Sequence, residues 1–573
     1  MNIKYTLKSA LFKLNSNFSI DDCTKELSAV ALRNDSAALQ LIVASDEPFA
    51  LLTGRSNWFS KDNPMAALRI SADCDFDVKL NIVDMHTGDG GEVKYADALL
   101  STDTLEIPAH TPTAVYIEAA IPASAEAGSY PLKFRLFGGK LFEDERLLGE
   151  ACAEIEVLDY ILHDTKFNKF HLDLWQHLSN IARKAEVPLW SDEHFTVIEG
   201  YVRSLGELGQ KAVTLIVTDA PWAGQGCFRE KEFPGNLFEY SIVPVCRNAD
   251  GSFEYDYSIM QRYIDLCAAY GIDRELSVYG ICGTWKAEDE GFGRLAPDYP
   301  DALRIRYLDR ADGCYKYMRT AAEIDGYIAA LEQYFVKTGQ IDKVRIAADE
   351  PADIEAYRAI LAHLGEIAPA FRFKAAINHP EFVSEFGEEV YDFAPSYGSL
   401  CTKFNELDNY RRTMKGKRFL YYICCGPSFP NNFLDSDLTE SLYLGVMASY
   451  AQFDGLLRWS YTVWNDDPRA DLRYGSWRAG DTCLVYPQKN GRPLLTLRWK
   501  ALKRAITIYE LLETLRAADA QWLDEAFGLV MRERDITKCA SVPLEELCST
   551  DPADYDALIR FVTDKLIRGY KKA

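Results

Sequence analysis

The sequence of 573 residues is too long for one ordinary hydrophobic core, so we expect two or three domains. Its 48% hydrophobic and 26% charged residues are typical of a water-soluble globular protein. With 63 basic and 86 acidic side chains the net charge is -23, which argues against nucleic acid or an anionic membrane surface as a partner.

The N-terminal segment has no unbroken apolar core of signal-peptide length, because Lys4, Lys8 and Lys13 interrupt it. No stretch of the chain approaches the ~20 apolar residues of a membrane-spanning helix. The 14 cysteines include no C-x-x-C pair, so we expect buried reduced thiols and no disulfide framework. Together these features predict a cytoplasmic protein.

Residues 1–158 are predicted to form a β-sandwich domain. Short runs rich in β-branched or aromatic residues are separated by turns that contain Gly, Pro, Asn or Asp, at 37–45, 113–122, 130–137 and 151–160. A two-sheet sandwich fits this pattern better than a closed barrel or a helical domain.

Residues 159–516 alternate between strand-like and helix-like segments. The predicted strands are 170–175, 211–217, 275–281, 344–349, 371–378, 390–396, 418–425 and 455–463. The predicted helices are 192–209, 257–270, 320–337, 353–365, 381–387, 402–414, 437–451 and 496–516. Eight strands alternating with eight helices predict a (β/α)8 TIM barrel, with surplus length at 218–256 and 282–319. Residues 517–573 are predicted to be a short helical extension on the outside of the barrel.

The segment "KVRIAADEP", residues 343–351, begins as an apolar strand and ends in two adjacent carboxylates and a proline. Burying unpaired carboxylates is costly, so this pair belongs at the end of the strand, where such barrels place their catalytic groups. Pro351 ends the strand because it has no N–H to donate. Asp349 and Glu350 are therefore the candidate catalytic residues, and a solvated loop without chemistry is the alternative.

Two carboxylates at one strand end suggest glycoside hydrolysis, and their adjacent positions restrict its mechanism. A conventional retaining glycosidase holds its acid and its nucleophile on separate elements, whereas neighbours reach the sugar from one side. The pair is better suited to a substrate whose 2-acetamido oxygen attacks the anomeric carbon and gives an oxazolinium intermediate. One carboxylate then orients the amide and the other protonates the leaving oxygen. The conventional two-carboxylate route stays open, with the second carboxylate supplied by Asp219, Asp392 or Asp466.

Aromatic and polar side chains gather at the other predicted strand ends. Single aromatic residues are as often core packing as sugar platforms, but their concentration on one face favours a carbohydrate cleft. The candidate substrate-binding residues are His171, Asp173, Trp175, Asn378, Tyr421, Trp459, Tyr461 and Trp464. Trp222, Tyr422 and Trp477 are further aromatic residues at these ends.

The stretch "GLLRWSYTVWNDDPRADLRYGSWRAGDTCLVYP" (455–487), its continuation "RWKALKRAITIYELL" (498–512) and the "DEP" strand end resemble a known family. They carry the domain-of-unknown-function 4091 pattern and are similar to glycoside hydrolase family 123, the β-N-acetylgalactosaminidases. The resemblance extends from about residue 30 to residue 515. It implies a sandwich followed by a barrel, exo-cleavage of β-linked N-acetylgalactosamine with retention, and no cofactor. It also implies that Asp349 orients the acetamido group, that Glu350 is the general acid/base, and that Trp175 or Trp459 lines the sugar pocket.

Two other functions compete with this one. A non-catalytic sugar-binding protein would also use an aromatic cleft, but it has no need of a proton donor. A metal-dependent hydrolase would need several converging imidazoles, whereas the chain has 8 histidines and only the pair His171 and Asp173 resembles a ligand set, so we expect no metal. The expected partner is an oligosaccharide or glycoside, imported because no export signal is seen, and a homo-oligomer is left open.

Overall fold

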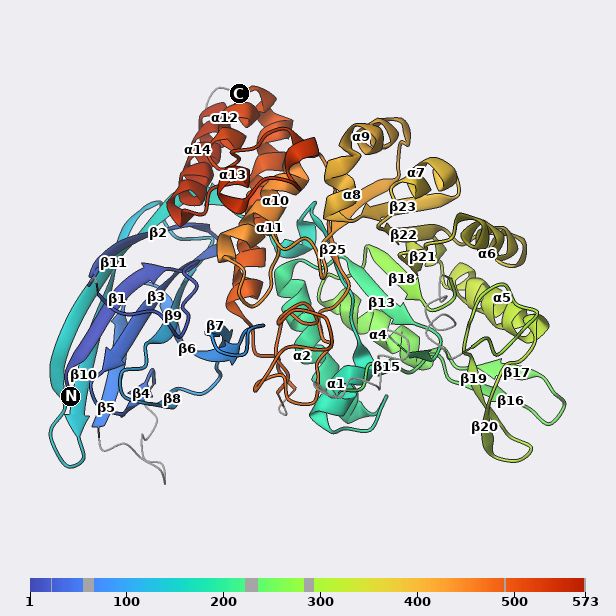
Figure 1. The fold of residues 1–573 in the computed structure, drawn as a ribbon, viewed down its shortest axis with the longest axis horizontal. Coiled ribbons are helices and arrows are strands. Elements are labelled where there is room, and N and C mark those ends of the chain that lie inside the picture. The colour runs from blue at the N-terminus through green and yellow to red at the C-terminus, as the bar shows by residue number, and fades with distance from the viewer. Residues whose placement is uncertain (22, 55–65, 222–234, 283–292, 489–490, 571–573) are drawn as a thin grey trace.

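The computed structural model describes residues 1–21, 23–54, 66–221, 235–282, 293–488 and 491–570. Figure 1 shows a β-rich N-terminal part beside an α/β barrel, with the C-terminal helices over the junction between them. This architecture confirms the predicted order of sandwich, barrel and C-terminal helices. The domain boundaries at residues 158 and 516 stay predictions.

Two sheets form the N-terminal part. The first has the order β1 (Ile3–Ser9), β3 (Asp35–Ser45), β9 (Thr113–Ile121), β6 (Asp77–Thr87) and β7 (Lys94–Leu99). The second has the order β2 (Glu26–Arg33), β11 (Arg146–Ile161), β10 (Gly128–Lys140), β5 (Ala66–Asp73), β4 (Phe49–Leu52) and β8 (Thr104–Ile107). Burial alternates along β10, where Leu132, Phe134 and Leu136 are buried and the residues between them are exposed. This period of two is what a sheet with one face against a core requires.

Eight parallel strands of the described chain form the barrel sheet. In sheet order they are β12 (His171–Leu174), β25 (Gly455–Arg458), β24 (Arg418–Tyr422), β23 (Val390–Pro395), β22 (Phe373–Ile377), β21 (Val344–Asp349), β18 (Glu275–Tyr279) and β13 (Ala212–Ile216). Each coincides with a predicted strand to within a few residues. Short apolar runs bounded by helical segments are thus sufficient to identify the strands of a parallel barrel.

The seam between β12 and β13 is closed partly by side chains. The backbone N–H of Lys211 donates to the carbonyl of Leu172 at 3.0 Å, and the N–H of Leu174 donates to Oε1 of Gln210 at 3.0 Å. Further along the same seam, the N–H of Thr214 donates to Oε1 of Gln176 at 2.9 Å. Two glutamine amides therefore take the place of backbone groups and satisfy strand edges that would otherwise be left unpaired.

The helices lie on the outside of the barrel (Figure 1). The predicted ones appear as α2 (Asp192–Leu208), α4 (Ser258–Ala269), α5 (Ala321–Lys337), α6 (Ile354–Ile367), α7 (Glu381–Phe386), α9 (Phe404–Thr413), α10 (Leu438–Tyr450) and α11 (Leu497–Asp519). The short helices α1 (Leu178–Ala185) and α8 (Tyr397–Thr402) were not predicted. Side-chain caps fix several starts, such as the capping box of Thr320 and Glu323 on α5.

The surplus segments after β13 and β18 come together in one small sheet. Its strand order is β17 (Phe253–Tyr255), β16 (Val245–Arg247), β19 (Arg306–Asp309) and β20 (Cys314–Tyr317), and β14 (Ala220–Pro221) pairs separately with β15 (Phe238–Glu239). These strands have two to four residues, too short for an alternation pattern to identify them in the sequence.

The C-terminal helices α12 (Leu523–Gly528), α13 (Leu544–Leu547) and α14 (Pro552–Tyr570) complete the structure. Asp556 of α14 pairs with Arg504 of α11 at 3.5 Å, and Arg560 pairs with Glu156 of β11 at 2.7 Å. The extension therefore packs on the barrel helix α11 and also contacts the sandwich. In the described chain, no helix combines the length and apolarity that crossing a bilayer requires.

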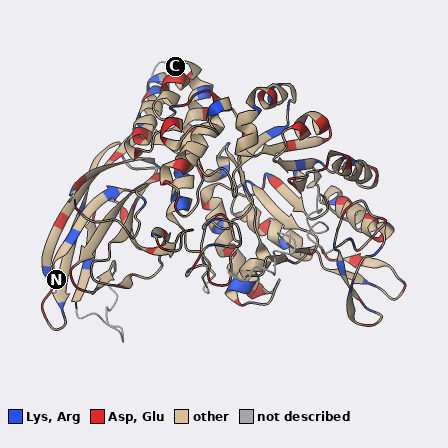
Figure 2. Ribbon diagram, viewed as in Figure 1, with Lys and Arg blue, Asp and Glu red and all other residues tan. Residues whose placement is uncertain are grey.

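The sandwich and the barrel are joined by ion pairs. Charged residues of both signs are interspersed along both parts (Figure 2). At the junction, Asp97 of β7 forms an ion pair with Arg498 of α11 at 2.8 Å, and both side chains are fully buried. Glu118 of β9 forms another with Lys500 at 2.7 Å. Burial alone would raise the pKa of Asp97, but the charge of Arg498 holds that pKa below its usual value. The two parts are therefore one packed unit at this surface.

Candidate active site

The carboxylates of Asp349 and Glu350 stand at the C-terminal end of β21, both half-buried. The N–H of Glu350 still donates to the carbonyl of Ala376 on β22 at 2.9 Å, but its φ is 46°, in the left-handed region. A non-glycine residue there carries a strain of about 1–2 kcal/mol, and such strain concentrates at functional sites. This turn breaks the strand alternation that would otherwise point the two neighbours to opposite faces.

Glu350 is held by neutral donors from two neighbouring strand ends. The hydroxyl of Tyr422, the last residue of β24, donates to Oε1 of Glu350, and Nδ2 of Asn378, directly after β22, lies 3.4 Å from Oε2. Burial, together with the negative charge of Glu350, raises the pKa of Tyr422 far above its usual value. The phenol therefore keeps its proton near neutral pH and acts as a donor to Glu350.

Asp349 acts most strongly on a different tyrosine. Burial raises the pKa of Tyr279, the last residue of β18, and the next cause is the charge of Asp349, which exceeds that of Glu350. The ring of Tyr279 is 5.5 Å from that of Trp175, which directly follows β12. The charge of Asp349 is therefore felt at Tyr279, beside Trp175, while Glu350 is bonded to Tyr422 and Asn378.

An aromatic cluster lines the same edge of the barrel. It consists of Trp175, Tyr279, Tyr422, Trp459, Tyr474 and Trp477, and it belongs to an apolar cluster separate from the main core. The rings of Trp459 and Trp477 are 5.2 Å apart, and Tyr474 stacks on Trp477 at 5.6 Å with an interplanar angle of 13°. Both tryptophans are half-buried, and Nε1 of Trp459 donates to Asp481 at 3.2 Å. Fixed, partly exposed indole rings are suited to the apolar face of a sugar.

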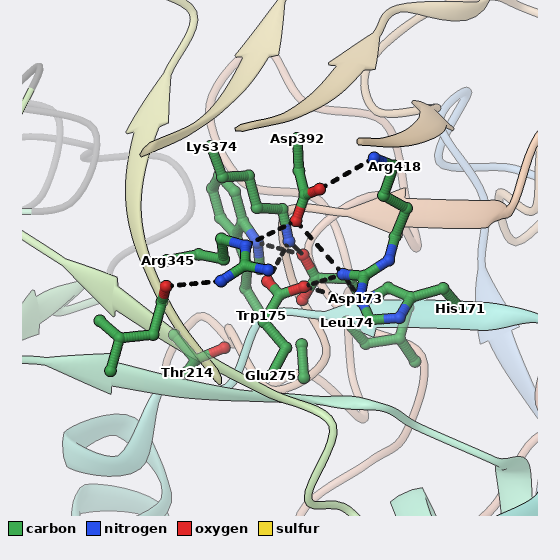
Figure 3. Close-up of polar contacts among 12 residues, drawn as sticks. His171, Asp173, Leu174, Trp175, Thr214, Glu275, Arg345, Lys374, Asp392 and Arg418 are labelled. Carbon is green, nitrogen blue, oxygen red and sulfur yellow. Dashed lines mark hydrogen bonds and ion pairs between the residues drawn. The ribbon is translucent and has the colours of Figure 1, made fainter. Parts of the chain in front are cut away.

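Below these strand ends, a layer of paired charges fills the barrel (Figure 3). Nζ of Lys374 donates to Asp173 and, at 2.6 Å, to Glu275. Glu275 also pairs with His171 at 2.9 Å and with Arg418 at 2.5 Å. Asp392 joins Arg345 at 2.9 Å to Arg418 at 3.3 Å. We call these seven residues, His171, Asp173, Glu275, Arg345, Lys374, Asp392 and Arg418, the ionic layer. Six of them lie in the first half of their strands, away from the end that carries the carboxylates, and Asp173 is the third of the four residues of β12.

Two side chains predicted to bind substrate belong to this ionic layer. His171 is buried at the start of β12, where burial and the charge of Arg418 lower its pKa to about 3. Asp173 is fully buried, and its Oδ2 also accepts a bond from Nε1 of Trp175 at 3.4 Å. The structure places both beneath the site, where Asp173 supports Trp175 and His171 pairs with Glu275.

Three further candidates point away from the carboxylates. The hydroxyl of Tyr421 donates to the carbonyl of Leu444 on α10 at 2.6 Å, that of Tyr461 bonds Ser204 on α2 at 2.7 Å, and Nε1 of Trp464 donates to Val485 at 2.8 Å. All three side chains are buried in packing with the helices. Tyr421 and Tyr422 are consecutive on a strand, so only one of them can face the barrel interior.

The structure thus brings together Asp349, Glu350, Asn378, Trp175 and Trp459 from the sequence-based candidates. Tyr279 and Tyr474 were missed, and Tyr422 was noted without being selected. Their positions in the sequence could have identified Tyr279 and Tyr422. Both are the last residues of their strands, at the same edge of the barrel as Asp349 and Glu350. Trp222 lies outside the described residues.

The three carboxylates considered as a second catalytic acid differ in their positions. Asp219 follows β13 and is buried, with its Oδ2 3.0 Å from Arg306 and 3.1 Å from the Tyr317 hydroxyl. Asp392 belongs to the ionic layer, and Asp466 is exposed. Within the described ranges, no group of three or more His, Cys, Asp and Glu is arranged to hold a metal ion.

Comparisons with known proteins identify the family and the fold. The family profile described as "Glycoside hydrolase 123, catalytic domain" matches residues 175–515, more than half of the chain. A family 123 glycoside hydrolase from Clostridium perfringens, studied for glycolipid glycan hydrolysis, superimposes with a TM-score of 0.77 at 16% identity, covering 100% of this chain and 99% of its own. At that identity the superposition shows the shared fold. No curated protein sequence matches the chain.

Two other solved structures match only weakly. An endo-β-1,6-glucanase gives a TM-score of 0.33 at 9% identity, with 60% of this chain and 76% of its own covered. An α-amylase from Geobacillus thermoleovorans gives 0.32 at 9% identity, with 62% and 82% covered. These likenesses are too weak to carry an argument about function.

Proposed function

Since the chain belongs to glycoside hydrolase family 123, we propose that it is a retaining exo-glycosidase that removes β-linked N-acetylgalactosamine with help from the substrate's own acetamido group. The observation that carries this proposal is the placement of Asp349 and Glu350 side by side at one strand end, with Glu350 held by Tyr422 and Asn378. The fold relative from Clostridium perfringens is described for glycolipid glycan hydrolysis, so the terminal sugar of such a glycan is the first substrate to test.

Glu350 is proposed as the general acid and base. Within the described residues its contacts are with the neutral side chains of Tyr422 and Asn378, so a change in its protonation breaks no described ion pair. In the first step its protonated carboxyl donates to the leaving glycosidic oxygen. In the second step the carboxylate accepts a proton from the water that opens the oxazolinium ring.

Asp349 is proposed to orient the acetamido group. Its carboxylate accepts the amide N–H, so the amide oxygen is turned toward the anomeric carbon, and it balances the positive charge that develops on the ring. Trp175 and Tyr279, 5.5 Å apart, offer an apolar wall on this side of the site for the acetamido methyl group. Trp459 and Trp477 are the proposed platform for the sugar ring.

The conventional two-carboxylate route is the competing mechanism. Asp219 is the one of its three candidates that is buried at a strand end, but Arg306 and Tyr317 already occupy its Oδ2. A covalent sugar trapped on Asp219 by a fluorosugar would support that route. Strong competitive inhibition by a thiazoline analogue of the oxazoline would support the acetamido route.

The experiment compares two chromogenic β-N-acetylgalactosaminides, one with a good and one with a poor leaving group. Wild type should hydrolyse both with retention of the β-configuration. Glu350→Gln should lose on the order of 10²–10⁴-fold of its kcat/KM with the poor leaving group and far less with the good one, because kcat/KM reports the first step, in which only the poor leaving group needs the acid. Equal losses with both substrates, or inversion, would overturn the assignment.

A further inference from the structure

Two adjacent cysteines directly follow the strand that positions Tyr422. β24 ends at Tyr422, and Cys424 and Cys425 come two and three residues later. Their Sγ atoms lie 3.7 Å apart, with Cys424 half-buried and Cys425 exposed. Neither thiol has a part in the proposed hydrolysis.

The two thiols are chemically unequal. The hydrogen bond from Cys424 lowers the pKa of Cys425 to about 7, and the same contact raises the pKa of Cys424. The nearby carboxylates of Asp481 and Glu350 oppose the ionisation of Cys425 but do not outweigh the bond. At neutral pH a substantial fraction of Cys425 is thus an exposed thiolate, the form that reacts, and Cys424 is a protonated thiol beside it.

We infer that Cys424 and Cys425 form a modification site for small-molecule disulfides, and that oxidation of this pair switches off the neighbouring active site. The Cys425 thiolate attacks one sulfur of a disulfide RSSR, which forms a mixed disulfide and releases RS⁻. Cys424 then loses its proton to solvent and attacks Sγ of Cys425, which forms the Cys424–Cys425 disulfide and releases the second RS⁻. Two thiols lose two electrons in total, and RSSR gains them.

The backbone around the pair explains the coupling to the active site. Disulfides usually join Cα atoms 4.4–6.8 Å apart, whereas consecutive Cα atoms are only about 3.8 Å apart. Closing the ring must therefore twist the peptide between the two cysteines. The N–H of Cys424 donates to the carbonyl of Gly426 at 3.0 Å, and the carbonyl of Cys424 accepts from Nδ2 of Asn431 at 3.0 Å. Twisting the peptide that follows Cys424 disturbs both hydrogen bonds. Tyr422, which holds Glu350, lies two residues away and moves with this turn.

The same geometry makes the modification reversible. A disulfide held away from its preferred geometry is more easily reduced than an unstrained one. A dithiol reductant should therefore restore the enzyme readily. The loss of activity rests on the proposed function, because it acts through Tyr422 and Glu350, whereas formation of the disulfide does not.

The test treats the folded full-length protein with glutathione disulfide, followed by acid quench, alkylation and peptide mass analysis. We expect the peptide with residues 424 and 425 to lose two hydrogen atoms and to resist alkylation. Activity should fall on the order of 10–100-fold, the usual cost of a small misplacement of a catalytic group, and dithiothreitol should restore both. The tryptophan fluorescence should change in parallel, since Trp459 and Trp477 are in the cluster that Tyr422 joins.

Two variants make the test specific. Cys425→Ser should keep its basal activity and become insensitive to glutathione disulfide. Cys314→Ser, which removes another exposed thiol on β20, should respond as wild type does. Free thiols at 424 and 425 under conditions that modify Cys314 would overturn the site. A complete Cys424–Cys425 disulfide without any change in fluorescence or activity would overturn the coupling, and the fluorescence readout stands even if no glycosidase activity is found.

Discussion

The two ends of the barrel strands use the same kinds of residue in opposite ways. In the ionic layer, Lys374, Arg418 and Arg345 neutralise the buried carboxylates of Asp173, Glu275 and Asp392. At the C-terminal edge, the described contacts of Glu350 come from an amide and a phenol. A carboxylate paired with a buried cation is fixed in charge, whereas one held by neutral donors can exchange a proton. The first arrangement holds the barrel together and the second is suited to catalysis.

Removing the proposed orienting carboxylate should give the largest effect on activity. Asp349→Asn should lower kcat by on the order of 10³-fold with good and poor leaving groups alike, because the amide must attack whichever group leaves. Steady-state assays with both chromogenic substrates check this. A loss confined to the poor leaving group would mean that Asp349 and Glu350 have exchanged roles.

Breaking the ionic layer should instead give the largest effect on stability. Lys374→Met leaves Asp173 buried without its cation and Glu275 with Arg418 alone, which should lower the free energy of unfolding by about 3–5 kcal/mol. Lys343→Met is the control, since Lys343 makes a half-exposed pair with Asp273 at 3.9 Å and should change stability by less than about 1 kcal/mol. Urea unfolding curves of the two variants should differ clearly. Similar curves would mean that the layer is not needed for folding.

The neighbouring tyrosines separate the two roles on one strand. Tyr422→Phe removes a donor to Glu350 and should lower kcat/KM about 10–100-fold with little effect on stability. Tyr421→Phe removes the bond to Leu444 and should reduce stability by about 1 kcal/mol while leaving kcat/KM near wild type. Thermal melts and kinetics on both variants provide the comparison. The reverse pattern would mean that Tyr421, and not Tyr422, points toward Glu350.

The pH dependence of stability should report on the ionic layer. His171 has a pKa of about 3 in the folded protein against about 6.5 when unfolded, so the unfolded state binds the extra proton. Its contribution is therefore complete above pH 6.5 and is lost as the pH falls toward 3, by up to about 2 kcal/mol between pH 6.5 and 5. Wild type should lose more stability over this interval than His171→Gln. Parallel curves would show that His171 is protonated in the folded state.

The fold was largely predictable because its signals are local. Apolar runs identified every barrel strand in the described chain, and helical periodicity identified the eight main helices. The short strands β16, β17, β19 and β20 were missed because they are held by pairing between two distant insertions. The contact of α14 with β11 was missed for the same reason, since it depends on where the two parts meet.

The candidate site was only partly predictable. Asp349 and Glu350 could be selected because two carboxylates after an apolar strand conflict with burial anywhere except at its end. His171 and Asp173 looked like site residues, yet their partners Lys374 and Glu275 are about 100 to 200 positions away in the sequence. Choosing Tyr422 over Tyr421 required knowing which alternate residues of β24 face the barrel interior, and a shift of one residue in the strand reverses that choice.

The central claim is that the substrate's amide oxygen, positioned by Asp349, is the nucleophile. The most direct test measures kcat/KM for a series of chromogenic β-galactosaminides whose N-acetyl group carries no, one, two or three fluorine atoms. Fluorine withdraws electron density from the amide oxygen, so the account predicts a steep, progressive fall in kcat/KM along the series. A flat series would show that the amide oxygen does not attack, and would contradict the account.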